Sequence, residues 1–260
     1  MNLFRGLGKW RLQYRNNKHN IDNSLQENMK FILQEVSVMD IRKAILKNPR
    51  KIEFLLWLYN KFVGGNYIKG KWENEVIIRA SKLKRTKIIV NGKNNKIFID
   101  DFCRLSHCKI YIAGNNNVIH LSKKTAFVET EFHVEDDHNQ ITIGHHTSVA
   151  GKTHFAAIEG TKIIVGEDCM FSSDIHFRTG DSHAIVDSVG KRINHSEDIV
   201  LGNHVWIGTK VMCLKGVFVP SNCIVGAGTL LVKKYEGEYS IYAGTPAQQI
   251  KTNINWTRER

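Results

Sequence analysis

The stretch Leu201-Gly-Asn-His-Val-Trp-Ile-Gly-Thr-Lys-Val-Met-Cys-Leu-Lys-Gly-Val-Phe-Val-Pro-Ser-Asn-Cys-Ile-Val-Gly-Ala-Gly-Thr-Leu-Leu231 carries a six-residue repeat. An aliphatic residue recurs at every sixth position, with Cys213 as a departure, and a glycine follows it directly in three hexads. This period fits neither an α-helix nor an alternating strand. It fits a coil of three short flat faces, in which the aliphatic residue points inward and a small residue suits the corner. The recurring positions are Leu201, Ile207, Cys213, Val219, Val225 and Leu231.

Upstream the repeat lengthens to 22 residues, at Ile99, Leu121, Ile143 and Val165. We interpret this spacing as one 18-residue coil with a four-residue excursion. A 22-residue period alone also suits a right-handed β-helix, but the downstream register favours the left-handed form, and constant spacing disfavours an antiparallel sandwich. The sequence therefore predicts a mainly β chain, a left-handed parallel β-helix. Asparagine tolerates left-handed backbone, so stacked turns are expected at Asn94, Asn95, Asn115, Asn116 and Asn139.

The domain organisation follows from where these repeats stop. The hexad pattern disappears at about 178–197, which predicts a long loop leaving the coil, and such loops often carry function. Residues 1–75 instead show helix-like apolar spacing over Ser24–Val38 and Met39–Tyr59, interrupted at Asn48-Pro49. We predict a small helical N-terminal region (1–75) that packs against or caps the first coils, a β-helix (76–251) and a tail (252–260).

Composition narrows the class of protein. No run of about 18 apolar residues predicts a membrane span, and the N-terminus lacks the apolar region of a signal peptide. Five scattered cysteines form no C-x-x-C pair, which favours reduced thiols in a cytoplasmic protein. A net charge of +12 indicates a polyanionic partner. The basic residues are dispersed and form no nucleic-acid motif, so nucleic acid is disfavoured. Peripheral association with the inner face of the membrane stays a hypothesis.

A family resemblance rests on three segments and the loop. Ile199-Val-Leu-Gly-Asn-His-Val-Trp-Ile-Gly208, Val225-Gly-Ala-Gly228 and Ala243-Gly-Thr-Pro-Ala247 resemble the hexapeptide-repeat acyltransferases. With Gly180-Asp-Ser-His183 in the loop, the chain looks most like bacterial capsule and lipopolysaccharide O-acetyltransferases, including those that acetylate sialic acid polymers. The resemblance covers residues 88–251. It implies acetyl-CoA as donor, a hydroxyl of an acidic surface glycan as acceptor, and a homotrimer with sites between subunits.

The same resemblance suggests catalytic residues. Transfer of acetyl to a sugar hydroxyl needs a base, and histidine is the side chain whose ordinary pKa suits neutral pH. His183 matches the family's catalytic histidine, ahead of His176 and His195. It is expected to act as general base and deprotonate the acceptor hydroxyl, whose oxygen attacks the thioester directly. Asp181 would orient His183 or contact the cofactor. Trp206 would line the active site, with interface packing as the alternative.

Cofactor contacts are expected along small residues and lysines. Glycine and alanine would let the pantetheine arm approach the backbone, and lysines would hold the phosphates. Gln248 stands where many relatives carry lysine, which puts a phosphate contact there in doubt. The expected cofactor residues are Gly180, Ser182, Gly208, Lys215, Gly226, Ala227, Lys233, Lys234, Thr245 and Pro246.

Three alternatives stay open. The same fold carries γ-type carbonic anhydrases, which bind zinc through three histidines, and His133-x4-His138 has a suggestive spacing. A third ligand is not evident in the sequence, so no metal is expected. A non-catalytic glycan-binding β-helix is the second alternative. Acetylation of an amine or another small molecule on the same fold is the third.

Overall fold

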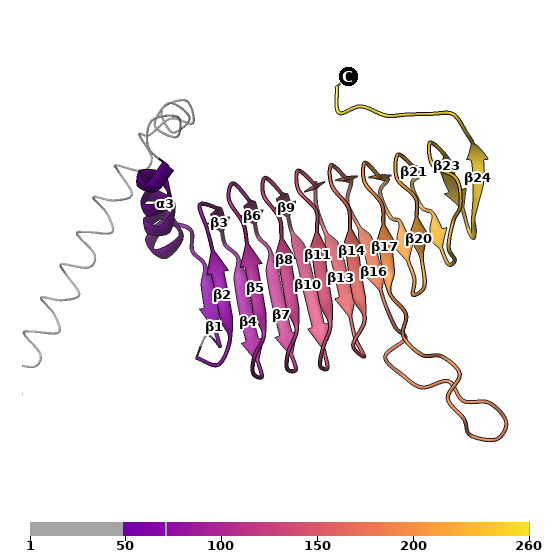
Figure 1. Cartoon of the computed structure of the whole chain (residues 1–260), viewed down its shortest axis with the longest axis horizontal. Helices are drawn as coiled ribbons and strands as arrows, with labels where there is room; N and C mark the ends of the chain where they lie inside the picture. The colour runs from indigo at the N-terminus through magenta and orange to yellow at the C-terminus, as the bar shows by residue number, and fades with distance from the viewer. Residues whose placement is uncertain (1–48, 71, 260) are drawn as a thin grey trace, which may run out of the picture. The chain divides into compact units, whose positions relative to one another are not determined.

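The computed structural model describes residues 49–70 and 72–259 (Figure 1). The chain divides into two units, residues 1–63 and 64–260. In the first, helix α3 (Pro49–Leu58) leads into a π-helical turn η1 (Tyr59–Val63). Proline at the first helical position is favoured because its fixed φ suits the helix and its missing N–H has no partner there. The interruption predicted at Asn48-Pro49 is thus where α3 begins, whereas the helical segment predicted over Ser24–Val38 lies outside the described residues.

The second unit is a parallel β-helix whose described strands form three sheets of eight, seven and nine strands, here called face A, face B and face C. Each coil contributes one strand to every face in turn, and all neighbouring strands are parallel except the terminal pair β23 and β24. Face A contains β1 (Tyr67–Lys69), β4 (Lys87–Asn91), β7 (Lys109–Ala113), β10 (Thr130–Glu135), β13 (Thr153–Ala157), β16 (Ile175–Arg178), β19 (Met212–Cys213) and β22 (Leu230–Leu231). Face B contains β2 (Glu75–Ile78), β5 (Lys96–Ile99), β8 (Val118–Leu121), β11 (Gln140–Ile143), β14 (Lys162–Val165), β17 (Ile199–Leu201) and β20 (Phe218–Val219). Face C contains β3 (Lys82–Lys84), β6 (Arg104–Ser106), β9 (Ala126–Val128), β12 (Ser148–Val149), β15 (Met170–Phe171), β18 (Trp206–Ile207), β21 (Ile224–Val225), β23 (Ile241–Gly244) and β24 (Ala247–Lys251).

The core confirms both repeats of the sequence. The four residues of the 22-residue repeat, Ile99, Leu121, Ile143 and Val165, are all buried on face B. The six hexad positions from Leu201 to Leu231 are buried as well, including the departure Cys213, whose small apolar side chain fits the interior. Alternate residues of each strand point inward, so every coil stacks its apolar side chains on those of the next coil. The first strand, β1, begins at Tyr67, so strands start inside the stretch 1–75 that the sequence assigned to helix.

The predicted asparagine turns form a buried ladder. Asn94 and Asn116 adopt left-handed backbone, with φ of 56° and 57°. Asn95, Asn117 and Asn139 lie beside them and are buried. Each amide Nδ2 donates to the Oδ1 of the asparagine one coil earlier, at 3.0 Å from Asn117 and 3.2 Å from Asn139. These bonds give the corner between faces A and B a polar, satisfied interior.

The loop predicted at 178–197 connects β16 of face A to β17 of face B (Figure 1). Residues 179–198 occupy it, and Val186 and Arg192 form an antiparallel bridge near its tip. Four apolar side chains of the loop are exposed: Ile185, Val186, Val189 and Ile193. Within the described part of the chain, no helix is long and apolar enough to cross a bilayer.

Candidate active site

The loop is fixed to the β-helix at its root by Glu159. Arg192 Nη1 lies 2.7 Å from Glu159 Oε1, and Arg192 Nη2 donates to Oε2 at 3.0 Å. Ser196 Oγ donates to the same Oε2 at 2.8 Å. These hydrogen bonds, first that of Arg192 and then that of Ser196, lower the pKa of Glu159 to about 2. Two residues of the returning part of the loop, Arg192 and Ser196, therefore share one anchor on the preceding coil.

A second anchor holds the segment that carries the histidine. Lys215 Nζ lies 2.5 Å from Asp181 Oδ2, and Asn194 Nδ2 donates to the same oxygen at 2.8 Å. Hydrogen bonds from Lys215 and then Asn194 lower the pKa of Asp181. Asn194 is buried and its Nδ2 also donates to the carbonyl of His183 at 2.8 Å. The backbone at His183 is thus positioned, while its imidazole is exposed.

The structure locates the other residues of the Gly180-Asp-Ser-His183 segment. Gly180 is buried, and a Cβ at this position would lie 2.1 Å from Ser196 Oγ and 2.7 Å from Ile158 Cδ1. This close packing explains why position 180 is a glycine, independently of any contact with a cofactor. Ser182 adopts left-handed backbone, with φ of 65°, and is exposed beside His183. Asp181 contacts Lys215 and Asn194 here rather than the imidazole that the sequence expected it to orient.

Trp206 lies on face C, in β18, with 38% of its surface exposed. The loop leaves the β-helix at the corner between faces A and B, which is opposite face C in a three-sided coil. One chain therefore does not bring Trp206 and His183 together. The next two histidine candidates are also separated: His176 lies exposed on face A, and His195 lies exposed in the returning part of the loop.

The small residues expected to contact the cofactor gather at the corner between faces C and A. A Cβ at Gly208 would lie 2.7 Å from the backbone nitrogen of Ala227, and one at Gly226 would lie 3.0 Å from Ala243 Cβ. Thr245 Oγ1 donates to the carbonyl of Gly228 at 3.4 Å, and a cis bond joins Thr245 to Pro246. The corner is thus a tightly stacked backbone surface, which matches the close approach expected of a pantetheine arm.

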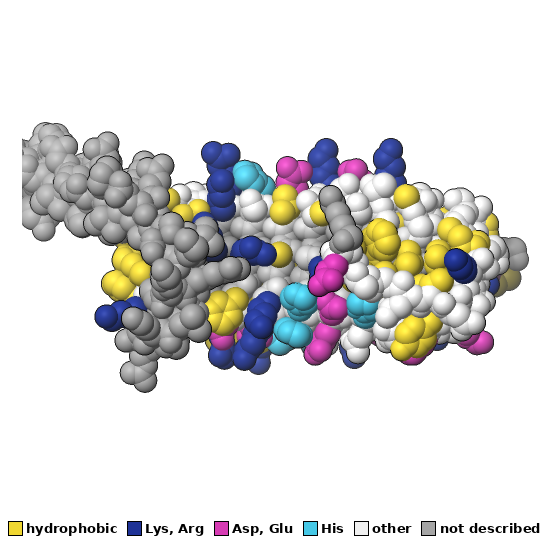
Figure 2. Space-filling view, turned by 90° about the horizontal axis from the view of Figure 1, so that it is seen from above, with side chains coloured by type: hydrophobic (Ala, Val, Ile, Leu, Met, Phe, Trp, Pro, Cys, Tyr) yellow, Lys and Arg dark blue, Asp and Glu magenta, His cyan; other side chains and the backbone are white. Residues whose placement is uncertain are grey.

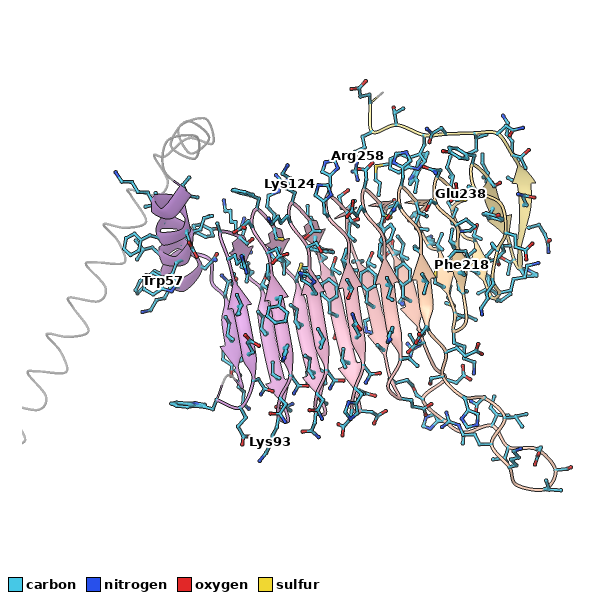
Figure 3. The ribbon with its side chains drawn as sticks, in the orientation of Figure 1. Trp57, Lys93, Lys124, Phe218, Glu238 and Arg258 are labelled. Carbon is cyan, nitrogen blue, oxygen red and sulfur yellow. The ribbon has the colours of Figure 1, made fainter. Side chains whose placement is uncertain are left out.

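The predicted lysines lie elsewhere, at the corner between faces A and B. Lys215 is occupied by Asp181, and Lys233 Nζ sits 5.7 Å from the ring centre of Tyr235. Lys234 borders a cavity of about 580 Å³ between the returning loop and the next coils, near the exposed Phe218 (Figure 3). Its lining residues are Ser196, Glu197, Asp198, Val200, Gly216, Val217, Phe218 and Lys234. The expected cofactor residues therefore divide between two corners that flank face A.

The C-terminal tail forms a cluster that the sequence did not reveal. Trp256 stacks on His204 with 4.0 Å between ring centres, and its ring centre lies 6.2 Å from that of Trp206. Arg258 Nε donates to Asp168 Oδ1 at 3.0 Å, and Asp168 Oδ2 pairs with His204 Nδ1 at 2.8 Å. Partial burial opposes the charge of Asp168, but hydrogen bonds from His204, Arg258 and His146 lower its pKa. Figure 2 views this side, where histidine and acidic side chains lie close together over the middle of the β-helix.

Comparison with known proteins identifies similar chains. No protein-family model matches. The polysialic acid O-acetyltransferase of Neisseria meningitidis is 33% identical over 110 residues, and that of Escherichia coli O1:K1 is 34% identical over 97 residues. These segments cover 42% and 37% of this chain but only 51% and 31% of the two relatives. The chain thus matches about half or less of the length of these curated relatives.

Two solved structures are similar over a larger part of the chain. They are the polySia-specific acetyltransferase NeuO and the polysialic acid O-acetyltransferase OatWY. Each is 30% identical to this chain with a TM-score of 0.63 over 75% of it. The similarity covers 86% of the NeuO chain and 89% of the OatWY chain. The similarity therefore includes most of both solved chains. Its sequence identity of 30% is higher than a shared fold alone requires.

Proposed function

This chain belongs to the polysialic acid O-acetyltransferase family, and we propose that it transfers acetyl from acetyl-CoA to a hydroxyl of an acidic, sialic acid-containing surface glycan. The observation that carries the proposal is the anchored histidine loop. His183 has an exposed imidazole on a backbone held by Asn194, and the loop root is fixed by Asp181 and Glu159. A base presented in this way can reach a bulky acceptor while keeping a defined position.

In the proposed reaction His183 accepts the proton of the sugar hydroxyl as the oxygen attacks the thioester carbonyl. The carbon–oxygen bond forms, the tetrahedral intermediate collapses, and the carbon–sulfur bond breaks. The proton on His183 then goes to the departing thiolate of CoA. The stacked backbone at Gly208, Ala227 and Thr245 supports a pantetheine site, and Lys233 and Lys234 stay candidates for the phosphates.

We further propose that the enzyme is a homotrimer in which the loop of one subunit meets face C of another. Two observations support this arrangement. The loop exposes four apolar side chains, Ile185, Val186, Val189 and Ile193, which packing against a second subunit would bury. Trp206, exposed on face C, is on the far side of the coil from His183 of the same chain. Assembly would place His183 near Trp206 of the partner subunit.

The proposal is tested by mass spectrometry of polysialic acid incubated with the full chain and acetyl-CoA. We expect acetyl groups on sugar oxygens, and turnover lower by about 10²–10⁴ in His183→Ala, the usual contribution of a general base. His195→Ala, an exposed histidine of the same loop, is the matched control and should retain turnover. For an anionic polymer, kcat/KM should fall as salt rises, whereas a neutral acceptor should respond less. If the enzyme acetylates only amines, the proposed glycan acceptor is wrong and the acceptor is a small molecule.

A further inference from the structure

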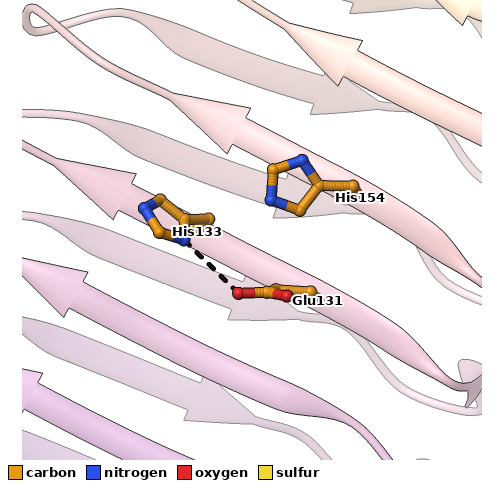
Figure 4. Close-up of side chains that lie close together, drawn as sticks. All are labelled: Glu131, His133 and His154. Carbon is orange, nitrogen blue, oxygen red and sulfur yellow. Dashed lines mark hydrogen bonds and ion pairs between the residues drawn. The ribbon is translucent and has the colours of Figure 1, made fainter.

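Three side chains of face A converge outside the site described above. Glu131 and His133 are two residues apart on β10, so both point outward from the same face. His154 on β13 is the direct register partner of Glu131. One oxygen of Glu131 and one nitrogen of each histidine lie within 4.8 Å of one another (Figure 4). The parallel register of two coils therefore builds a compact group of one carboxylate and two imidazoles.

Neighbouring residues hold two of these side chains in place. His133 Nε2 lies 3.0 Å from Glu135 Oε1, and Lys109 Nζ donates to Glu131 Oε1 at 2.7 Å. If His133 donates its Nε2–H to Glu135, its Nδ1 lone pair faces Glu131 Oε1 at 3.4 Å. Two lone pairs facing each other repel unless a proton or a cation lies between them, and a metal ion there would replace the hydrogen bond of Lys109 to the same oxygen. A carboxylate that orients a histidine through its second nitrogen is the usual support of a metal-binding imidazole.

The third side chain, His154, is partly buried, and one of its nitrogens lies within 4.8 Å of the ligand atoms of Glu131 and His133. The 3.4 Å between His133 Nδ1 and Glu131 Oε1 is close to the ligand separation of roughly 3.4 Å in a tetrahedron with bonds of about 2.1 Å. His154 lies farther out, within 4.8 Å of the other two ligand atoms, and would have to move closer to complete this geometry.

We propose that Glu131, His133 and His154 bind one divalent transition metal ion of the zinc type, with a fourth position open to water. Two imidazoles and one carboxylate form a known zinc ligand set. His138, which the sequence paired with His133 by its spacing, lies exposed at the corner between faces A and B, with φ of 63°, and is not part of this group. The ion would connect β10 to β13 and so stabilise adjacent coils.

The experiment measures metal binding alone and is independent of acetyl transfer. The chelator-treated full chain is dialysed against Zn²⁺ and its metal content is measured, and Co²⁺ is titrated as a spectroscopic probe of tetrahedral coordination. We expect about one ion per chain, since residues 49–70 and 72–259 contain one such ligand group. A higher melting temperature with Zn²⁺ is also expected, because an ion that binds only the folded state stabilises it.

Variants decide between this site and adventitious binding. The double variant His133→Ala/His154→Ala should lose the bound ion and the zinc-dependent rise in melting temperature. Glu135→Gln should weaken binding by about 10- to 100-fold, the usual effect of losing a carboxylate that orients a ligand. His176→Ala, the next histidine ring on face A at 6.1 Å from His154, is the matched control and should bind normally. The proposal is overturned if the wild-type chain takes up no Zn²⁺, or if the double variant binds as much as the wild type. Should the double variant fold poorly, Glu131→Gln must abolish the tetrahedral Co²⁺ spectrum, and an unchanged spectrum would refute the site.

Discussion

Lys215 Nζ pairs with Asp181 Oδ2 at 2.5 Å across 34 residues of sequence, which ties the histidine loop to the coil that follows it. From the sequence, Lys215 is expected to bind a cofactor phosphate, and Asp181 is expected to orient His183 or contact the cofactor. In the structure each residue neutralises the other. Their pair holds the loop beside His183, so we assign both residues a positioning role in the proposed reaction.

A double-mutant cycle tests the coupling of this pair. Lys215→Ala and Asp181→Asn should each lower kcat/KM by about 10- to 100-fold, because loss of the anchor misplaces the base. The double variant should lose no more than the more damaging single change, since the two residues act together. Lys123→Ala, an exposed lysine at the corner between faces B and C, serves as control and should retain kcat/KM. If Lys215→Ala raises only the KM for acetyl-CoA and Asp181→Asn does not, Lys215 binds the phosphate instead.

Acid should release the loop. The pKa of Glu159 is lowered to about 2, chiefly by the hydrogen bond of Arg192, and that of Asp181 is lowered by Lys215. A depressed pKa means that the folded loop favours the ionised carboxylate, so its contribution is complete above the ordinary carboxylate pKa of about 4 and is lost as pH falls from there toward 2. Cleavage of the loop by pepsin should therefore rise sharply between about pH 4 and 2.

The variant Glu159→Gln gives the matched test of this acid effect. Its loop should be cleaved readily already at a pH well above 4, because glutamine cannot form the charged pair with Arg192. Glu167→Gln changes an exposed carboxylate that faces His145 away from the loop and should leave the cleavage profile unchanged. Equal profiles for the wild type and Glu159→Gln would mean that other contacts hold the loop.

The sequence predicted the β-helix because inward positions recur at constant intervals that can be counted along the chain. Ile99 and Leu121 face the interior for the same reason, and the loop was visible as a break in that count. The sequence could not predict contacts between coils on the outer surface. Asp168 meets Arg258 only because the tail returns over the coils, and Glu131 meets His154 only through the register of β10 and β13. Insertions such as the loop change the number of residues between strands that pair on neighbouring coils. The outward-facing residues that become neighbours therefore cannot be identified from one sequence.

The tail cluster yields a prediction on local stability. Arg258 donates to Asp168, to Ser148 Oγ at 2.9 Å and to two backbone carbonyls. Because charge-assisted hydrogen bonds contribute about 1.5 kcal/mol or more, Arg258→Ala should raise tail opening by about 10-fold, less if water screens the pair strongly. Hydrogen exchange of residues 252–259 and of the Trp256 indole N–H, which donates to the carbonyl of His204 at 3.0 Å, reports this opening.

Thr257→Ala provides the control for the tail, because its hydroxyl donates to the carbonyl of Glu259 within the same segment. Its exchange should match that of the wild type. Overall unfolding should change little in Arg258→Ala, since the tail opens as a local unit. A large fall in the melting temperature of the whole chain would instead show that the tail is part of the cooperative fold.

The asparagine ladder predicts a position at which substitution of one buried polar side chain strongly lowers the stability of the β-helix. Asn117 is fully buried, its Nδ2 donates to Asn95 Oδ1 and to the carbonyl of Asp136, and its Oδ1 accepts the backbone N–H of Asn139 at 2.7 Å. Asn117→Ala removes the side-chain partners of the Asn139 backbone N–H and of the Asp136 carbonyl on the next coil, whereas Asn95 Oδ1 keeps the backbone N–H of residue 117 as a donor. We expect a loss of about 2–3 kcal/mol in the free energy of unfolding, the cost of unpaired buried groups. Urea denaturation measures it, with Asn115→Ala as control, because Asn115 lies in the same turn but forms exposed hydrogen bonds to Asp137. An Asn115 variant as unstable as the Asn117 variant would mean that turn geometry, rather than buried hydrogen bonding, stabilises this corner.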